Sequence, residues 1–242
     1  MPEHDLRLLA LDGGGVRGLS TLQILKQLMD TIDPESPPKP CDYFNMIGGT
    51  STGGSCIDVY VSLSDRIFQK QRYSVMIKGR LERAIKEIVV RQGLAEDALL
   101  KDAPDAKCKV FVCVISNETG DMIWEVGRVT SAASSFFDPI IIGDFKESFV
   151  DGAVGANNLD IWPSSSLEDK IKCLALIGTG VPLLTPFKDD VIETEKIVER
   201  FSRDKLRLDD TGRHFWFNVL RGLEDIGLED LKRKNAIIAA ID

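Results

Sequence analysis

The stretch Gly48–Gly54, with the sequence GGTSTGG, follows an apolar run at Tyr43–Ile47 that predicts a buried strand. Its centre, Gly49–Gly53, matches the pattern G-x-S-x-G, with Ser51 as the candidate nucleophile. A serine on a sharp turn needs neighbours without a Cβ, because the backbone there is strained and folds tightly on itself. Apolar side chains at helical spacing follow over residues 56–67. Although such clusters also form ordinary loops, this context predicts a strand–turn–helix unit.

A second unit of the same kind lies near the N-terminus. An apolar run at Leu6–Leu11 leads into Asp12–Gly18, whose sequence is DGGGVRG, and leucine and isoleucine residues then recur at helical spacing. The glycines are therefore expected to open a helix. Backbone N–H groups at a helix N-terminus are exposed and stabilise negative charge.

The glycine-rich stretch has three interpretations. Gly13–Gly18 fits the dinucleotide fingerprint G-x-G-x-x-G, but that fingerprint expects an acidic residue about 20 positions later, at the end of a second strand. Asp30 and Asp33 fall instead at a predicted helix end and in a proline-rich loop. The N–H groups could equally form an oxyanion hole for acyl transfer, or the glycines could form a structural turn. This stretch alone leaves the three open.

The remaining segments predict one α/β domain over residues 1–242, because no repeat or linker interrupts them. Further strands are expected at Lys109–Ile115, Ile171–Ile177 and Phe215–Leu220, and a hairpin from Ile140–Ile142 and Ser148–Val150. Helices are expected at Leu81–Gln92 (ended by Gly93), Glu193–Lys205 and Leu228–Ala240, with a loop at Pro34–Pro40 and close packing of small residues within Trp124–Phe137.

Composition excludes several functions. A net charge of −8 argues against nucleic acid as a partner and against electrostatic docking on anionic membranes, though not against apolar insertion. The five cysteines form no C-x-x-C pair, so buried free thiols in a reducing compartment are expected rather than disulfides or a zinc site. No secretory signal or run of about 20 apolar residues is present, which predicts a soluble intracellular protein.

A serine nucleophile needs a base, and histidine is scarce in this chain. His4 lies in a charged tail and His214 lies beside large aromatic residues without a glycine turn. Asp151 is the better candidate, because it follows a predicted strand and precedes Gly152, and chemistry gathers at strand ends in open parallel sheets. An Asp-Gly pair is more commonly a simple turn. Partial burial would raise the carboxyl pKa and make Asp151 a stronger base.

Arg17 has two interpretations in this scheme. It could support the glycine loop or attract an anionic head group, or it could be a solvated surface arginine.

Three motifs, at Asp12–Gly18, Gly49–Gly54 and Asp151–Ala153, together resemble the patatin-like phospholipase family, most closely the patatin domains of large fungal proteins. The resemblance implies a three-layer α/β/α fold with a mostly parallel central sheet. It also implies hydrolysis of fatty-acyl esters of phospholipids or neutral lipids by a Ser51–Asp151 dyad, without a metal or organic cofactor. The implied oxyanion hole is Gly13, Gly14 and Gly15, and the implied supporting residues are Arg17, Gly18, Gly49, Gly53 and Gly152.

The chain departs from the family pattern after the serine, where Gly53–Ser55 runs almost directly into Cys56–Asp58 and the expected longer apolar helix is contracted. A patatin domain that binds a lipid or a protein without turnover is therefore the alternative, and a nucleotide-binding enzyme is a third hypothesis. We expect a lipid substrate, transient contact with membrane surfaces and a cytoplasmic, peripheral location. The oligomeric state is not predicted.

Overall fold

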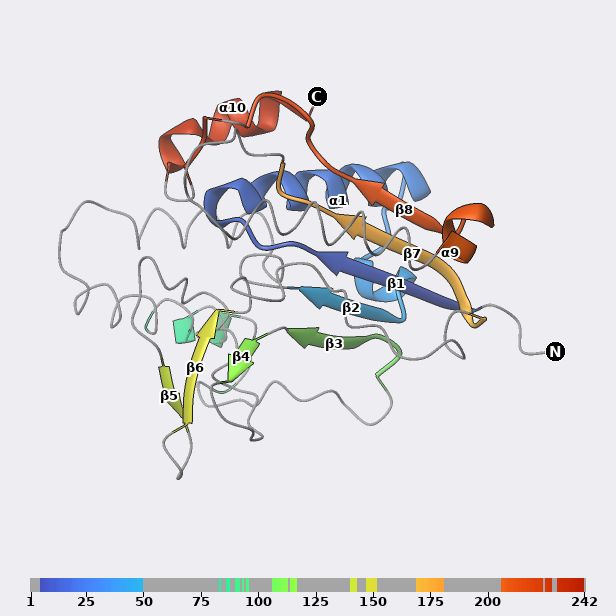
Figure 1. Cartoon of the computed structure of the whole chain (residues 1–242), viewed down its shortest axis with the longest axis horizontal. Helices are drawn as coiled ribbons and strands as arrows, with labels where there is room; N and C mark the ends of the chain where they lie inside the picture. The colour runs from blue at the N-terminus through green and yellow to red at the C-terminus, as the bar shows by residue number, and fades with distance from the viewer. Residues whose placement is uncertain are drawn as a thin grey trace.

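A computed structural model gives the structure of the chain and describes residues 5–49, 83, 86, 87, 90, 91, 93, 95, 106–112, 114–116, 140–142, 147–151, 169–180, 206–223, 225–227 and 230–241. The central feature is a five-stranded sheet in the order β3-β2-β1-β7-β8, in which every neighbouring pair is parallel (Figure 1). Its strands are β1 (Leu6–Leu11), β2 (Met46–Gly49), β3 (Lys109–Val112), β7 (Ile171–Ile177) and β8 (His214–Phe217).

Helices cover both faces of this sheet. Successive side chains of a strand point to opposite faces, and β1 carries apolar side chains on both of them. Leu9 and Leu11 of β1 pack with Leu25 and Met29 of α1 (Gly18–Ile32) on one face. On the other face, Leu8 and Ala10 of β1 belong to a cluster with Leu208 of α9 (Leu206–Asp210). The fold is therefore a three-layer α/β/α arrangement around a parallel sheet, as the sequence predicts.

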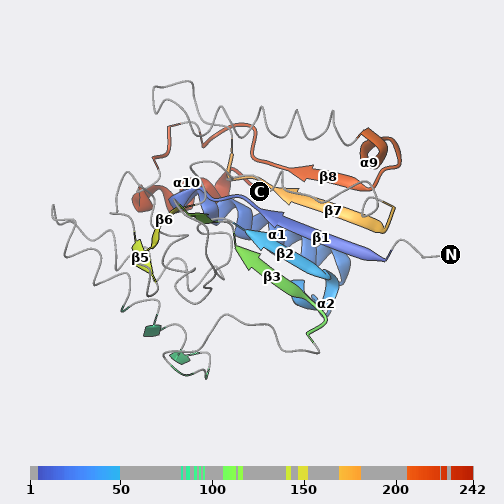
Figure 2. The ribbon, with the colours of Figure 1, turned by 60° about the horizontal axis from the view of Figure 1, so that its bottom comes forward.

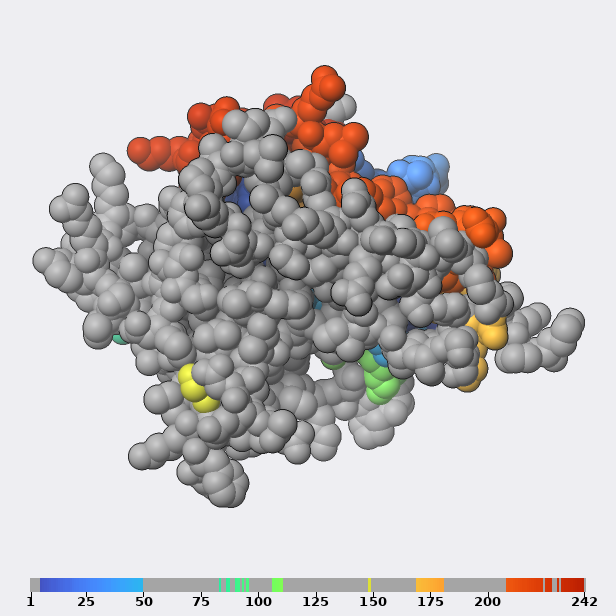
Figure 3. Space-filling view, in the orientation of Figure 1, coloured from blue at the N-terminus to red at the C-terminus, as the bar shows by residue number. Residues whose placement is uncertain are grey.

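The outer side of α1 is covered by the C-terminal segment. Leu19 and Leu22 of α1 share a buried cluster with Ile237 of α10 (Lys234–Ala239), which follows a short 3-10 helix η3 (Leu231–Arg233). In the space-filling view, the C-terminal segments that contain α9 and α10 form the upper rim of the molecule (Figure 3). Within the described ranges, no helix combines the length and apolar character needed to cross a bilayer.

The carboxyl ends of all five parallel strands lie level with one another, and Figure 2 shows their arrows pointing the same way. In the register, Leu11 pairs with Gly49 on one side and Ile177 on the other. The row is completed by Val112, opposite Gly49, and Phe217, opposite Ile177. Loops that follow these strands therefore leave the sheet at one common edge, where ligands of open α/β sheets bind.

A smaller antiparallel sheet, with the order β4-β6-β5, adjoins β3 in the chain. It consists of β4 (Val114–Ser116), β5 (Ile140–Ile142) and β6 (Glu147–Asp151). The predicted hairpin of the isoleucine run and Ser148–Val150 is confirmed by the β5–β6 pairing. The single strand predicted at Lys109–Ile115 is wrong, because the run leaves the parallel sheet after Val112 and β4 pairs with β6 instead.

Three other predicted boundaries are also wrong. Tyr43 ends a short helix, α2 (Pro40–Tyr43), rather than beginning the strand, and Pro40 opens that helix because its fixed φ suits a first helical turn. The strand β8 ends at Phe217 rather than Leu220, because the side chain of Asn218 accepts bonds from two backbone N–H groups. The last helix begins at Lys234 instead of residue 228.

Other predictions have mixed outcomes. The described residues of the segment 81–92 are helical up to residue 91, and Gly93 has a positive φ of 77° in the turn that follows, as predicted. Cys41 and Cys173 are free thiols, although Cys41 is exposed rather than buried. The predictions for Trp124–Phe137 and Glu193–Lys205 lie outside the described residues.

Candidate active site

The glycine loop leaves the sheet at the level row of strand ends, directly after β1. The N–H of Asp12 still donates to the carbonyl of Ile177 at 3.0 Å, and the chain then turns through a 3-10 helix, η1 (Gly15–Arg17), into α1. Gly15 has a φ of 54°, in the left-handed region that favours glycine. The glycines therefore open a helix, as the sequence predicts.

The N–H groups of this loop include donors without partners. Gly13 is buried and Gly14 is half-buried. Neither the N–H of Gly13 nor the N–H of Gly14 donates a hydrogen bond within the part of the chain that the structure describes. Because unpaired backbone donors are uncommon in proteins, two of them at the start of a helix favour a site for developing negative charge. The carbonyl of Gly14 is engaged, accepting from the N–H of Arg17 at 3.0 Å.

The loop after β7 packs directly against the glycine loop. Thr179 is 7% exposed, and its hydroxyl donates to the carbonyl of Gly13 at 3.2 Å. A Cβ added to Gly14 would meet Thr179 Oγ1 at 2.5 Å and Thr179 Cβ at 2.6 Å. In addition, the hydroxyl of Thr21 in α1 donates to the carbonyl of Gly178 at 3.0 Å. The two loops are therefore fixed to each other and to the helix.

The β7 loop is fixed from its other side by Asn218, the residue after β8. Its Oδ1 accepts from the N–H of Gly180 at 2.7 Å and from the N–H of Val219 at 2.9 Å. Gly180 has a φ of 91°, and Gly178 has no room for a Cβ, which would meet Asn218 Oδ1 at 2.7 Å. Glycine is therefore required at Gly178 by the lack of space beside Asn218, and glycine is favoured at Gly180 by the positive φ.

Sequence reasoning did not predict the hydrogen bonds that the side chains of Thr179, Asn218 and Thr21 make with the two loops. The available signal was the sequence Gly178-Thr179-Gly180 directly after a buried strand, where a loop of a parallel sheet is expected to approach a site.

Two buried charged residues flank the glycines. Asp12 is 4% exposed and Arg17 is 5% exposed, and neither side chain forms an ion pair among the described residues. Burial raises the pKa of the Asp12 carboxyl well above its ordinary value and lowers the pKa of the Arg17 guanidinium. The interpretation of Arg17 as a solvated surface residue is therefore wrong. Its Nε has no acceptor among the described residues.

The remaining predicted site residues are placed only in part. Gly49 is the last residue of β2 and Gly18 is the first residue of α1. Ser51, two positions after Gly49, lies outside the described residues, as do Gly53 and Gly152.

Asp151 is the last residue of β6, where it pairs with Val114. Its strand belongs to the antiparallel sheet rather than to the parallel one, so the expected reason for its position, the end of a parallel strand, is wrong. Val114 nevertheless begins β4 only two residues after Val112, which is in the level row opposite Gly49. Asp151 is therefore connected to the carboxyl edge through β4, because it pairs with Val114, the first residue of that strand.

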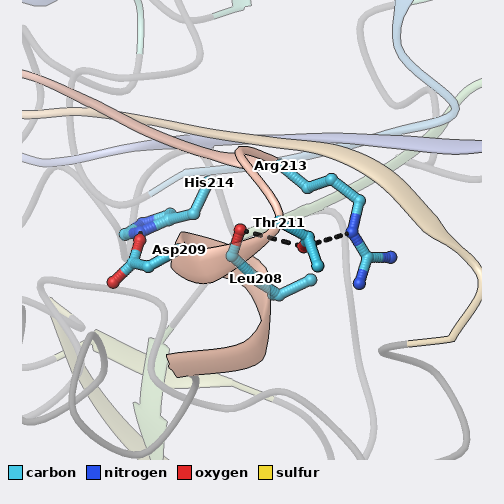
Figure 4. Close-up of polar contacts among 5 residues, drawn as sticks. All are labelled: Leu208, Asp209, Thr211, Arg213 and His214. Atoms are coloured by element: carbon cyan, nitrogen blue, oxygen red, sulfur yellow. Dashed lines mark hydrogen bonds and ion pairs between the residues drawn. The ribbon is translucent and has the colours of Figure 1, made fainter.

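His214 lies far from this edge. It is the first residue of β8 and pairs with Leu174, three residues before the level row, or about 10 Å along the strand. Its Nδ1 shares a hydrogen bond of 2.5 Å with Asp209 Oδ1 of α9, and Figure 4 shows the two side chains facing each other. The nearby Arg213 Nε donates to Thr211 Oγ1 at 2.7 Å. His4 lies outside the described residues.

The described ranges contain no group of three His, Cys, Asp or Glu side chains that could hold a metal ion. The described residues at the carboxyl edge include the backbone donors of Gly13 and Gly14 and the buried side chains of Asp12 and Arg17.

Comparison with known proteins supports a relationship to one family. The family model for patatin-like phospholipases matches residues 9–57, which contain the glycine loop and the G-x-S-x-G pattern. A "cGAMP-activated phospholipase" of Vibrio cholerae is 26% identical over 198 residues, covering 64% of this chain and 56% of that protein. "Patatin-1-Kuras 2" of Solanum tuberosum is 27% identical over 194 residues, covering 63% and 52%. The chain thus spans about half the length of the curated relatives it matches.

Among solved structures, VipD from Legionella pneumophila aligns with 98% of this chain and 67% of its own, at 14% identity and a TM-score of 0.38.

Proposed function

We propose that the chain is a patatin-like serine lipid acyl hydrolase of the phospholipase A type, which cleaves fatty-acyl ester bonds through an acyl-enzyme. The match of the patatin-like phospholipase model over residues 9–57 supports the reaction class. The narrower assignment to the fungal patatin-domain type stays a prediction, since the relatives described above are bacterial and plant proteins.

The observation that carries the proposal is the register at the carboxyl edge. Gly49 and Val112 lie opposite each other, and Ser51 and Val114 each follow two residues later. Asp151 is opposite Val114. Asp151 is thus joined to β3, the strand beside β2, by one strand pairing and two residues of chain. This connection supports a pairing of Asp151 with the serine that follows β2 in the sequence.

In the proposed reaction, the Asp151 carboxylate takes the proton from the Ser51 hydroxyl while the serine oxygen attacks the ester carbonyl carbon. The negative charge that develops on the carbonyl oxygen is stabilised by the N–H groups of Gly13–Gly15. The tetrahedral intermediate then collapses, and the departing alcohol takes the proton from the aspartate. Water, deprotonated by the same aspartate, attacks the acyl-enzyme, and the second tetrahedral intermediate collapses to the fatty acid while the serine oxygen takes the proton back from the aspartate.

The proposal also covers cofactors, the residues that support the site, the access of the substrate and the extent of the domain. No metal or organic cofactor takes part in the reaction. Gly18, Gly49, Gly53 and Gly152 support the turns, and Arg17 supports the glycine loop or attracts an anionic head group. The lipid substrate would be reached by transient contact with a membrane from the cytoplasmic side, and residues 1–242 would act as one domain.

Labelling with a fluorophosphonate probe tests the proposal, together with acyl release from a phospholipid, a triacylglycerol and a short-chain ester. The wild-type protein is expected to be labelled and to release acyl groups, and Ser51→Ala to do neither. Asp151→Asn is expected to lower turnover by about 10²–10⁴-fold, because it removes the base.

Ser36→Ala, which changes an exposed serine, serves as the matched control and should react like the wild type. A folded wild-type protein that is neither labelled nor active would contradict the proposal and favour a binding domain without turnover. Near-normal turnover of Asp151→Asn would contradict the dyad alone.

A further inference from the structure

The hydroxyl of Thr179 lies between two loops of the sheet and bonds to the main chain of the glycine loop. Its Oγ1 donates to the carbonyl of Gly13 at 3.2 Å, although the two residues are 166 positions apart in the sequence. The side chain is 7% exposed and fills the space in which Gly14 would carry a Cβ. Thr179 therefore fixes the peptide unit between Gly13 and Gly14 by a hydrogen bond and by packing.

That peptide unit also contains the N–H of Gly14. In a trans peptide the C=O and the N–H point in opposite directions. Because Thr179 holds the carbonyl of Gly13 on its own side, the N–H of Gly14 must point away from the β7 loop. Among the described residues nothing accepts from this N–H.

The order of the strands shows which element lies on the side of β1 opposite to β7. The strand β1 lies between β7 and β2, so the loop after β7 is on one side of β1 and the end of β2 is on the other. The chain that leaves β2 after Gly49 carries Ser51 two residues later. The N–H of Gly14 therefore points away from the loop after β7, and the described strand on the other side of β1 ends at Gly49, two residues before Ser51 in the sequence.

We propose that Thr179 is a positioning residue for the oxyanion hole, which aims the Gly14 N–H by holding the Gly13 carbonyl. This inference rests on the proposed hydrolase function and adds a residue to it. Thr179 does not touch the reacting atoms. It acts through the backbone, so its removal should weaken stabilisation of the transition state and leave binding of the ester unchanged.

Two substitutions separate the hydroxyl from the packing. Thr179→Val keeps the branched shape and removes the hydrogen bond, whereas Thr179→Ser keeps the hydroxyl and removes the methyl group. Thr179→Val is expected to lower kcat about tenfold with KM unchanged, less than the 10²–10³-fold typical for loss of a whole oxyanion donor. Thr179→Ser should restore most of this loss.

A trifluoromethyl ketone inhibitor gives a second measurement, because its adduct with a serine carries an oxyanion. Its inhibition constant should rise by about the same factor as kcat falls in Thr179→Val. Thr31→Val is the matched control. It removes a threonine hydroxyl that donates to the carbonyl of Gln27 at 2.8 Å on the exposed side of α1, and it should leave all constants unchanged.

The outcomes distinguish the inference from the function on which it rests. If wild-type turnover does not depend on Ser51, the proposed function fails and the inference fails with it. If turnover depends on Ser51 but Thr179→Val matches the wild type, only the inference is overturned. It is also overturned if Thr179→Ser loses as much as Thr179→Val, or if the loss of kcat disappears once each variant is assayed well below its melting temperature.

Discussion

Gly14 lies so close to Thr179 that a Cβ on Gly14 would come within 2.5 Å of Oγ1 and within 2.7 Å of Cγ2. The φ of Gly14 is −176°, which is not one of the positive values that favour glycine, and the lack of space beside Thr179 explains the glycine at this position. The two loops that follow β1 and β7 are therefore packed against each other at the carboxyl edge of the sheet.

Gly14→Ala is expected to destabilise the fold by about 1–3 kcal/mol, the usual effect of adding a methyl group to a filled site. The cause is that the Cβ of Thr179 belongs to the rigid part of that side chain and can move only with its backbone. Urea unfolding of the variant and the wild type measures the difference. Ser36→Ala, at an exposed loop position, is the control, and equal stability of Gly14→Ala would contradict the close packing.

The buried carboxyl of Asp12 makes stability depend on pH. Burial raises the folded-state pKa well above the value near 4 that an unfolded aspartate has. Between these two values the folded state binds more protons than the unfolded state, so this group's contribution to stability is full below about pH 4 and is lost as the pH rises through the folded pKa.

Asp12→Asn removes this dependence, because the amide does not titrate. The free energy of unfolding of the variant is therefore expected to increase relative to that of the wild type between pH 5 and pH 8, so that the variant becomes relatively more stable. Denaturant unfolding at both pH values measures it. Asp225→Asn, which changes an exposed carboxylate, is the matched control. A constant difference between Asp12→Asn and the wild type would show that Asp12 is ionised in the folded protein at both pH values.

The sequence predicts those parts of the fold that depend on local pattern. Leu6–Leu11 and Ile171–Ile177 are recognisable because strands buried on both faces are nearly continuous apolar runs. The glycine loop is recognisable because glycines directly follow such a run and precede helical spacing. In contrast, the run at Lys109–Ile115 also appears continuous, yet the chain changes sheets within it, and only pairing with distant strands decides where.

The candidate site depends still more on distant contacts. The glycines at 13–15 were predicted from their own sequence, whereas the Thr179 and Asn218 contacts join loops after three different strands. No local pattern specifies which side chain will fill the space beside Gly14. The pairing of Asp151 with Val114 likewise depends on an antiparallel sheet that the sequence indicates only as an isolated hairpin.

His214→Asn tests whether histidine takes part in the proposed reaction. Its position at the amino end of β8, bonded to Asp209, places it at the wrong end of the strand. The rate of fluorophosphonate labelling is therefore expected to stay within about twofold of the wild type, because catalytic bases must lie within hydrogen-bond reach of the nucleophile. Loss of labelling in a folded variant would place His214 in the site.

Arg17 gives the last prediction, because its guanidinium is buried where α1 begins. Its Nε has no acceptor among the described residues, and burial lowers its pKa. Arg17→Met retains the length of the side chain and removes the charge, so stability is expected to stay equal or to rise by about 1 kcal/mol.

If this charge attracts an anionic head group, KM of Arg17→Met for an anionic phospholipid should rise about threefold or more, the change expected for loss of one weak charge interaction. KM for a neutral short-chain ester should not change. Acyl release from both substrates at two salt concentrations measures the effect, and salt should reduce the difference. Arg17→Lys is the matched control because it keeps the charge. An equal rise of KM for both substrates would instead show that Arg17 only supports the glycine loop.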